Sequence, residues 1–199
     1  MLKTVQLYGG AVSTVVPDGF LDVSLLREVP DTQEVYVNSR TAAEVAQCTD
    51  GLGEDESILV DLLQRVDADS DEEALRVHVG EIAELNGSRG QWRLLQREVL
   101  EMEQQDQHQH HAQAAIVVEQ VPLRGSGRSG AETVVSCIGL IRLEDVATDV
   151  VISINVTLQG TIEDGDGDDE AVPPRVAAAF TILKQIISNF KVHDKSLFA

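Results

Sequence analysis

Short runs of apolar residues, separated by turn-forming residues, predict strands in the N-terminal part of the chain. Gly9-Gly10 and Pro17-Asp18-Gly19 are strong turn signals between such runs. The predicted strands cover residues 5–8, 11–16 and 34–38. A stretch rich in Ile, Leu and Val follows at 57–66, and it fits either a strand or a buried helical turn.

The spacing of apolar residues then changes to the period of a helix. Ser70 and Glu73 form a capping-box pattern at its start, and Asn86-Gly87 provides the left-handed residues that end it. His78 falls on the apolar face, so we expect a packed, hydrogen-bonded core imidazole rather than a catalytic one. The residues predicted to face the core are Leu75, Val79, Ile82 and Leu85.

Residues 91–104 fit a helix or a strand, whereas the next three segments have the period of strands. These segments are 115–121, 133–143 and 150–158, and their short connections favour an antiparallel meander. In the last of them one face carries Val150, Ile152, Ile154, Val156 and Leu158.

A final helix is predicted to begin at Pro173-Pro174, because proline is favoured in the first helical turn. Its apolar stripe, with steps of three and four, consists of Val176, Phe180, Leu183, Ile187 and Phe190.

Charge narrows the range of partners. The 199 residues are 43% hydrophobic and 25% charged, as in globular chains, but the net charge is −19. Nucleic acids and anionic membranes select clustered Lys and Arg, so neither is an expected partner, whereas a basic protein surface is. The alternative is that the excess of acidic residues serves solubility alone.

The N-terminus has no secretory pattern and no run approaches 18 apolar residues. We therefore expect an intracellular protein whose Cys48 and Cys137 are reduced, buried thiols.

Sequence patterns that suggest catalysis or metal binding lack the context such sites need. Residues 125–130 read G-x-G-x-x-G, but a strand-like segment follows instead of the helix that a dinucleotide site requires. The acidic loop 163–170 lacks the glycine and the bidentate Glu of a calcium loop. The Gln/His tract 104–113 is expected to be a solvated loop. The absence of a supporting context lowers the expectation of an enzyme without removing it, and we expect no cofactor or metal.

The acidic residues are concentrated toward the N-terminus. Residues 1–75 hold 16 acidic and four basic side chains, a net charge of −12. Several of the acids stand in turns or at strand edges, so neighbouring early strands would gather them into one patch that suits a basic partner. The alternative is a scattered, solvated face.

Several segments resemble the Ran guanine nucleotide release factors, the Mog-type proteins of nuclear import. The most specific is 26–38, LREVPDTQEVYVN, and similar segments include LYGGA at 7–11, GFLDVS at 19–24 and DKSLFA at 194–199. The likeness runs in order along the whole chain.

The resemblance implies an α+β fold, a PsbP-like α/β/α sandwich whose mostly antiparallel sheet of about six strands has helices on both faces. Residues 1–199 would form one Ran-binding domain with loop insertions at 104–113 and 163–171. The spacing of apolar residues by itself predicts only the antiparallel sheet and its helices.

The resemblance also implies a monomeric, nuclear and partly cytoplasmic regulator without catalytic residues of its own. It would bind the small GTPase Ran, preferring the GTP form, promote nucleotide release and share Ran with other import proteins. The implied contacts are Asp22, Asp31, Glu34 and Asp61, and Gln64 stands where the family has a further Glu, which weakens that contact. The alternatives are a carboxylate- or metal-dependent hydrolase and a general acidic scaffold for basic proteins.

Overall fold

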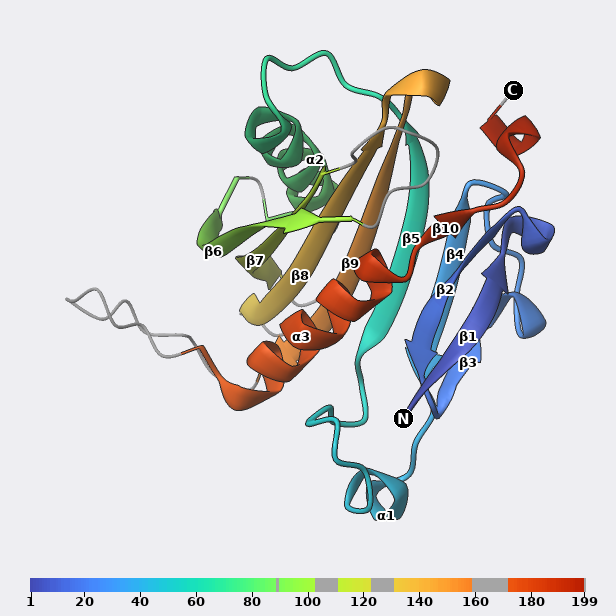
Figure 1. The fold of residues 1–199 in the computed structure, drawn as a ribbon. Coiled ribbons are helices and arrows are strands. Elements are labelled where there is room, and N and C mark those ends of the chain that lie inside the picture. The colour runs from blue at the N-terminus through green and yellow to red at the C-terminus, as the bar shows by residue number, and fades with distance from the viewer. Residues whose placement is uncertain (89, 103–110, 123–130, 159–171, 199) are drawn as a thin grey trace.

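The computed structural model describes residues 1–88, 90–102, 111–122, 131–158 and 172–198 (Figure 1). Within them the strands form an antiparallel sheet of seven and a smaller sheet of three. The large sheet runs, in spatial order, β3 (Phe20–Asp22), β4 (Gln33–Asn38), β5 (Ser57–Gln64), β9 (Thr148–Leu158), β8 (Ala131–Leu143), β7 (His111–Pro122) and β6 (Trp92–Glu101). The small sheet runs β1 (Leu2–Leu7), β2 (Val12–Pro17) and β10 (Lys191–Val192).

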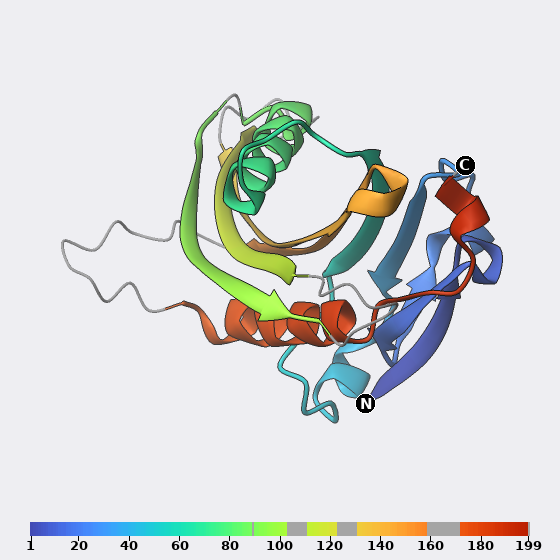
Figure 2. The ribbon, with the colours of Figure 1, turned by 45° about the horizontal axis from the view of Figure 1, so that its top comes forward.

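In the described part of the chain, one long helix lies on each face of the large sheet. It curves around α2 (Asp71–Asn86), whereas α3 (Pro174–Ser188) lies against its outer side (Figure 2). A short helix, α1 (Ala42–Val45), lies in the connection between β4 and β5. The expected α+β arrangement, an antiparallel sheet between helices, is therefore confirmed, and the large sheet has seven strands rather than about six.

The main core lies between the outer face of the large sheet, α3 and the small sheet. The whole apolar stripe predicted for the last helix is buried there. The predicted apolar face of β9 is buried from Val150 to Val156, and Leu158 is partly buried against the same core. Gly139 on β8 lets α3 approach closely, because a Cβ at that position would stand 2.5 Å from Ile187 Cδ1.

A second core lies between α2 and the inner face of the sheet. Ser70 caps the helix by accepting the N–H of Glu73, and Gly87 ends it in the left-handed conformation with φ 83°. The Glu73 carboxylate reaches back to the N–H of Asp69, not to the cap residue as a capping box would. Leu75 and Val79 are buried in this core.

His78 is part of a fully buried polar network, as predicted for a core imidazole. Its Nε2 lies 2.9 Å from Asp149 Oδ2, and Arg142 Nε donates to Asp149 Oδ1 over 3.1 Å. The Val66 N–H also donates to Asp149, so one carboxylate joins α2, β8, β9 and the start of the β5–α2 connection. The His-Asp pair therefore has a structural explanation.

The structure decides between the alternatives that the pattern left open. Residues 57–66 and 91–104 contain strands, β5 and β6, and the three later strand predictions correspond to β7, β8 and β9, paired antiparallel in that order. The small sheet was not predicted as a separate sheet. Among the described residues no helix has the length and hydrophobicity to span a bilayer.

Three further expectations from the sequence are wrong. Leu85 is 79% exposed, because α2 turns this side of its last turn away from the sheet. Cys48 is exposed, although Cys137 is buried and burial raises the pKa of its thiol to about 12. Residues 111–113 begin β7 instead of belonging to a loop. The remaining predicted loops, 104–110, 125–130 and 163–171, lie outside the described residues.

Candidate functional site

The carboxylates implied by the resemblance lie around one end of β4, at the edge of the large sheet. Asp22 ends β3 opposite Tyr36, and Glu34 lies two residues before Tyr36 on β4. Side chains alternate between the faces of a strand, so Asp22, Tyr36 and Glu34 share the outer face. Asp61 pairs with Gln33 and therefore points to the inner face. We call Asp22, Asp31, Glu34 and Asp61 the acidic edge.

The Asp22 side chain has a fixed position. It is the cap of a 3₁₀ turn, Val23–Leu25, and its Oδ1 accepts the N–H of Ser24 over 2.8 Å. Aspartate is favoured at such a position because its oxygen satisfies a backbone donor that the turn leaves free. The capping geometry therefore holds one negative charge beside the outer face of β4.

Glu34 joins the two sheets. Its Oε1 accepts the backbone N–H of Tyr8 over 2.5 Å, and Tyr8 lies in the 3₁₀ turn between β1 and β2. Tyr8 has φ 50°, an uncommon conformation for a residue with a side chain, and Gly9 follows with φ 65°. Burial raises the pKa of the Glu34 carboxyl, the Tyr8 N–H opposes that rise, and the negative charge of Asp22 adds to it.

The Asp61 side chain is held by a hydrogen bond from the neighbouring strand of the large sheet. Its Oδ1 accepts a hydrogen bond from Gln33 Nε2 over 2.7 Å, across the β4–β5 pair. Burial raises the pKa of Asp61, and the Gln33 amide partly offsets this rise. A carboxylate in this condition gains more from an added cation than a fully solvated one, since it has already lost part of its hydration.

Asp31 and Gln64 are the exposed members of the predicted set. Asp31 stands in the segment just before β4, and among the described residues its side chain accepts no hydrogen bond. Gln64 ends β5 opposite Thr148. It lies three positions after Asp61, so the two side chains point to opposite faces of the strand.

Tyr8 belongs to this site, although the sequence analysis did not single it out. Its hydroxyl donates to the carbonyl of Val60 over 2.8 Å. Burial raises the pKa of this hydroxyl, and the charges of Asp61 and Glu34 raise it further. Tyr8-Gly9-Gly10, a tyrosine directly before two turn glycines, was the available signal.

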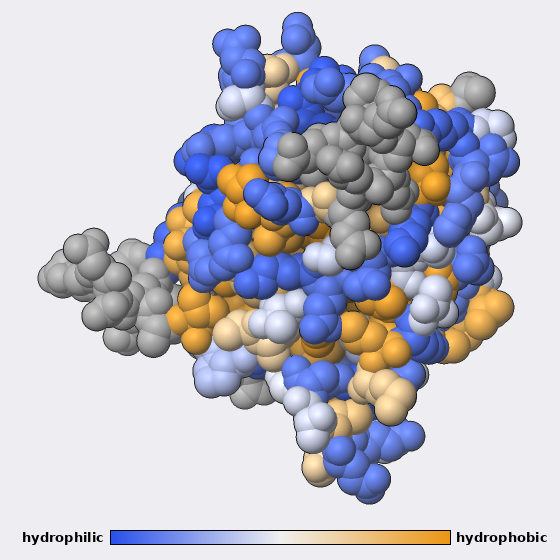
Figure 3. Space-filling view, in the orientation of Figure 1, coloured by the Kyte–Doolittle hydropathy of each residue, from blue (hydrophilic) through white to orange (hydrophobic). Residues whose placement is uncertain are grey.

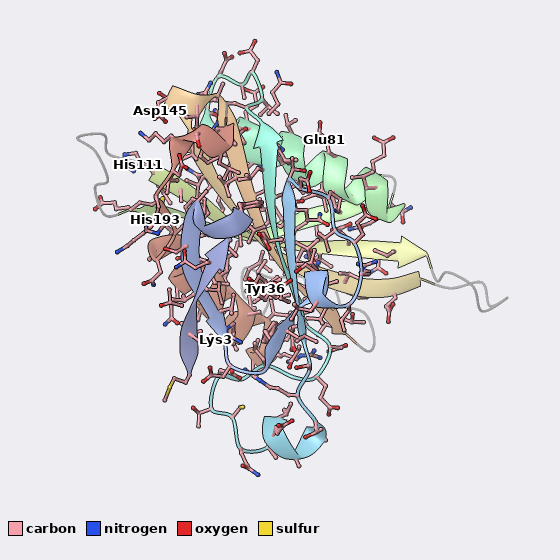
Figure 4. All side chains as sticks on the ribbon, turned by 90° about the vertical axis from the view of Figure 1, so that its right-hand side faces the viewer. Lys3, Tyr36, Glu81, His111, Asp145 and His193 are labelled. Atoms are coloured by element: carbon pink, nitrogen blue, oxygen red, sulfur yellow. The ribbon has the colours of Figure 1, made fainter. Side chains whose placement is uncertain are left out.

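Tyr36 occupies the centre of the outer side of the site. It is buried, and Figure 4 places it between the small sheet and the β4–β5 part of the large sheet. Burial, followed by the charges of Glu34 and Asp22, raises its pKa to about 12. The phenol therefore stays neutral and does not balance the charge of either carboxylate.

The acidic edge thus combines three carboxylates on strands with one, Asp31, in a loop. Asp22 and Glu34 lie on one face, Asp61 on the other and Asp31 in the preceding loop, so the charges surround the end of the strand. Within the described residues no group of three or more His, Cys, Asp or Glu side chains is arranged to hold a metal ion. The arrangement suits a cationic surface that is large enough to reach both faces.

Comparisons with known proteins agree on one family. A family model described as "Ran-interacting Mog1 protein" matches residues 5–157. The chain is 45% identical over 197 residues to the nuclear import protein MOG1 of Saccharomyces cerevisiae. The aligned region covers 99% of this chain and 85% of that protein. It is 29% identical over 174 residues to the Ran guanine nucleotide release factor of Danio rerio, covering 84% of this chain and 86% of the relative.

The structural comparison extends over the whole chain. The crystal structure of the Saccharomyces cerevisiae Ran-binding protein Mog1p superposes with a TM-score of 0.82 at 44% identity, covering 100% of this chain and 99% of that one. A solved structure of a Mog1 mutant gives a TM-score of 0.81 at 43% identity, with full coverage of both chains.

Proposed function

The chain belongs to the Mog1 family of Ran-interacting proteins, and from this premise we propose that it binds the small GTPase Ran through the acidic edge and promotes release of the guanine nucleotide. The observation that carries this proposal is the 45% identity, over nearly the whole chain, to a nuclear import protein. The gathering of charged side chains around the end of β4 supports the choice of surface.

The division of the carboxylates between two faces supports a protein partner. Glu34 and Asp61 leave adjacent strands on opposite sides of the sheet, so the backbone of the sheet lies between them. A small substrate held by a catalytic acid and base needs both groups on one side. A protein surface of standard size, about 800 Å² per partner, can enclose a strand end from both sides. This favours docking over the hydrolase alternative.

Electrostatic attraction brings the partners together, and a difference in affinity releases the nucleotide. A negatively charged edge facing Lys and Arg accelerates encounter by roughly 10–10³-fold at low salt. Release requires that the chain bind more tightly to a Ran conformation that holds the phosphates poorly, because a ligand shifts an equilibrium only by its differential affinity. Carboxylates provide this difference when they engage basic or switch residues of Ran that otherwise help to hold the nucleotide.

In this proposal the chain regulates Ran and carries no catalytic residue of its own. It acts as a monomer, prefers Ran loaded with GTP and shares Ran with other import proteins. Its place of action is the nucleus, with some protein in the cytoplasm, in keeping with the names "nuclear import protein" of two yeast relatives.

The test is the release of labelled GTP from purified Ran, with and without the chain. We expect faster release, and we expect Asp31→Lys to abolish most of the acceleration while the unfolding midpoint stays the same, because Asp31 is exposed. Glu101→Lys is the matched control, since it makes the same charge change on β6, at the far edge of the large sheet. An unchanged GTP release rate with the unaltered chain would refute the proposal.

The same assay distinguishes the acidic-scaffold alternative. A scaffold for basic proteins would bind Ran and unrelated basic proteins equally, with no dependence on the bound guanine nucleotide. Equal effects of Asp31→Lys and Glu101→Lys would also favour a scaffold, because only the total charge would then matter.

A further inference from the structure

Two consecutive leucines project into solvent beside the acidic edge. Leu25 and Leu26 are 72% and 69% exposed, and among the exposed large hydrophobic residues of the described chain only these two are neighbours in sequence. Single exposed apolar residues are ordinary on protein surfaces, whereas an adjacent pair held outward needs an explanation.

The leucines stand on an ordered turn. The Asp22 carboxylate caps the turn, and the N–H groups of Leu26 and Arg27 both donate to the carbonyl of Val23, over 2.9 and 3.1 Å. Val23 is buried, and the turn packs against β4. The fold therefore anchors the turn by one apolar side chain and holds the next two leucines away from the core.

The charges around this pair have the sign of the acidic edge. Asp22 precedes the leucines, Glu28 and Asp31 follow them, and Arg27 is the single basic residue between 22 and 34. On the face drawn in Figure 3, hydrophilic residues cover most of the surface and apolar areas lie between them. One apolar area lies at the right-hand margin, which is the side of β3 in Figure 1. An apolar centre with a charged rim is the usual anatomy of a protein interface.

We propose that Leu25 and Leu26 are the apolar anchor of the Ran-binding surface, and that they insert into an apolar depression on Ran that is surrounded by Lys and Arg. This inference rests on the proposed function and assigns different steps of binding to the acidic edge and to the leucines. The acidic edge steers the encounter and sets its salt dependence, whereas the leucines slow dissociation. We choose Ran as the occupant because the acidic edge beside the leucines is the surface proposed to bind it. A basic rim on Ran would match the acidic edge, and the leucines would need an apolar contact inside that rim.

The experiment measures association and dissociation rates of the full chain with Ran at several salt concentrations. The double variant Leu25→Ser/Leu26→Ser should dissociate roughly 10- to 100-fold faster, as expected for loss of an interface hot spot, with nearly the same association rate and salt dependence. Asp31→Asn should instead slow association and reduce its salt dependence. Val99→Ser is the matched control, because Val99 is 57% exposed but lies on β6 at the opposite edge of the large sheet.

The outcomes separate this inference from the proposed function. If Asp31→Asn weakens binding but the double variant dissociates within twofold of the unaltered chain, the anchor is wrong and the acidic edge stands. If the unaltered chain does not bind Ran, both are wrong. Light scattering provides a third result, since self-association that the double variant abolishes, with unchanged Ran dissociation, would assign the leucines to a second copy and overturn the inference. Should the double variant unfold, Leu25→Gln and Leu26→Gln are measured singly.

Discussion

Neutralising Asp61 should weaken Ran binding without weakening the fold. The change Asp61→Asn keeps the size of the side chain and an oxygen that can accept the 2.7 Å hydrogen bond from Gln33 Nε2. It removes only the negative charge, whose partial burial raises the pKa of Asp61. The variant therefore separates the electrostatic role of the residue from its packing.

The sizes of the two effects should differ in a recognisable way. A hydrogen bond to a charged group contributes about 1.5–3 kcal/mol, so Ran affinity should fall roughly 10- to 150-fold. The free energy of unfolding at pH 7 should stay the same or rise, because the folded state no longer holds a partly desolvated charge.

The pH dependence of stability gives a second, independent test of Asp61. A group whose pKa is raised by folding contributes stability that is fully present below its unfolded pKa, about 3.9 for Asp, and that is lost as the pH rises through the folded pKa. The advantage of Asp61→Asn over the unaltered chain should therefore be smallest near pH 4, grow as the pH rises and then level off.

Both quantities can be measured on the same preparations. Urea unfolding at a series of pH values gives the stability difference, and titration calorimetry with Ran gives the affinity. Glu101→Gln, which removes one charge at the far edge of the large sheet, should leave both nearly unchanged. A loss of more than about 1 kcal/mol of stability in Asp61→Asn, the usual net worth of one hydrogen bond, would show that the charge supports the fold. Unaltered Ran affinity would remove Asp61 from the interface.

Five further substitutions test contacts that determine the stability of the fold. Glu34→Ala leaves the Tyr8 N–H without its acceptor and should lower the free energy of unfolding by about 1–3 kcal/mol, measured by urea unfolding, whereas Glu34→Gln keeps an acceptor and should lose less. Asp149→Ala leaves Arg142 and His78 without their shared carboxylate and should cost about 3–5 kcal/mol in the same assay, with the Ran affinity of the folded fraction unchanged. Gly139→Val pushes α3 away from the sheet and should lower the thermal midpoint through a cost of about 1–3 kcal/mol, whereas Gly80→Ala, where a Cβ meets nothing within 4 Å, should raise it through a gain of roughly 0.4–1 kcal/mol.

Periodicity predicts the elements whose burial pattern is continuous. The stripe of α3 and the alternation in β9 identify their buried faces correctly, since a long element repeats its signal many times. The small sheet escaped prediction because β10 has only two residues, and it pairs with Ser13 and Val12 across nearly the whole chain. Two residues carry no period, and pairing between the two ends of a chain leaves no local trace.

The division of the acidic edge between two faces could not be read from the sequence either. It depends on the register that sets Gln33 opposite Asp61, and a shift of one residue would have placed Asp61 beside Glu34 on the outer face. The resemblance supplied the identities of the residues, but only the register shows that they surround a strand end instead of lying side by side.

The position of the acidic edge explains why its members differ in their importance for stability. Tyr8 donates its N–H to Glu34 and its hydroxyl to the Val60 carbonyl, so the β1–β2 turn is fastened to the large sheet where the carboxylates gather. A cation from a partner must share the Glu34 carboxylate with this N–H. Among the described residues, the Asp31 carboxylate accepts no hydrogen bond that would compete with such a cation. Substitutions at Asp31 therefore report on binding alone, whereas those at Glu34 report on binding and folding together. A survey that treats the four carboxylates as equivalent would mistake a loss of stability for a loss of Ran recognition.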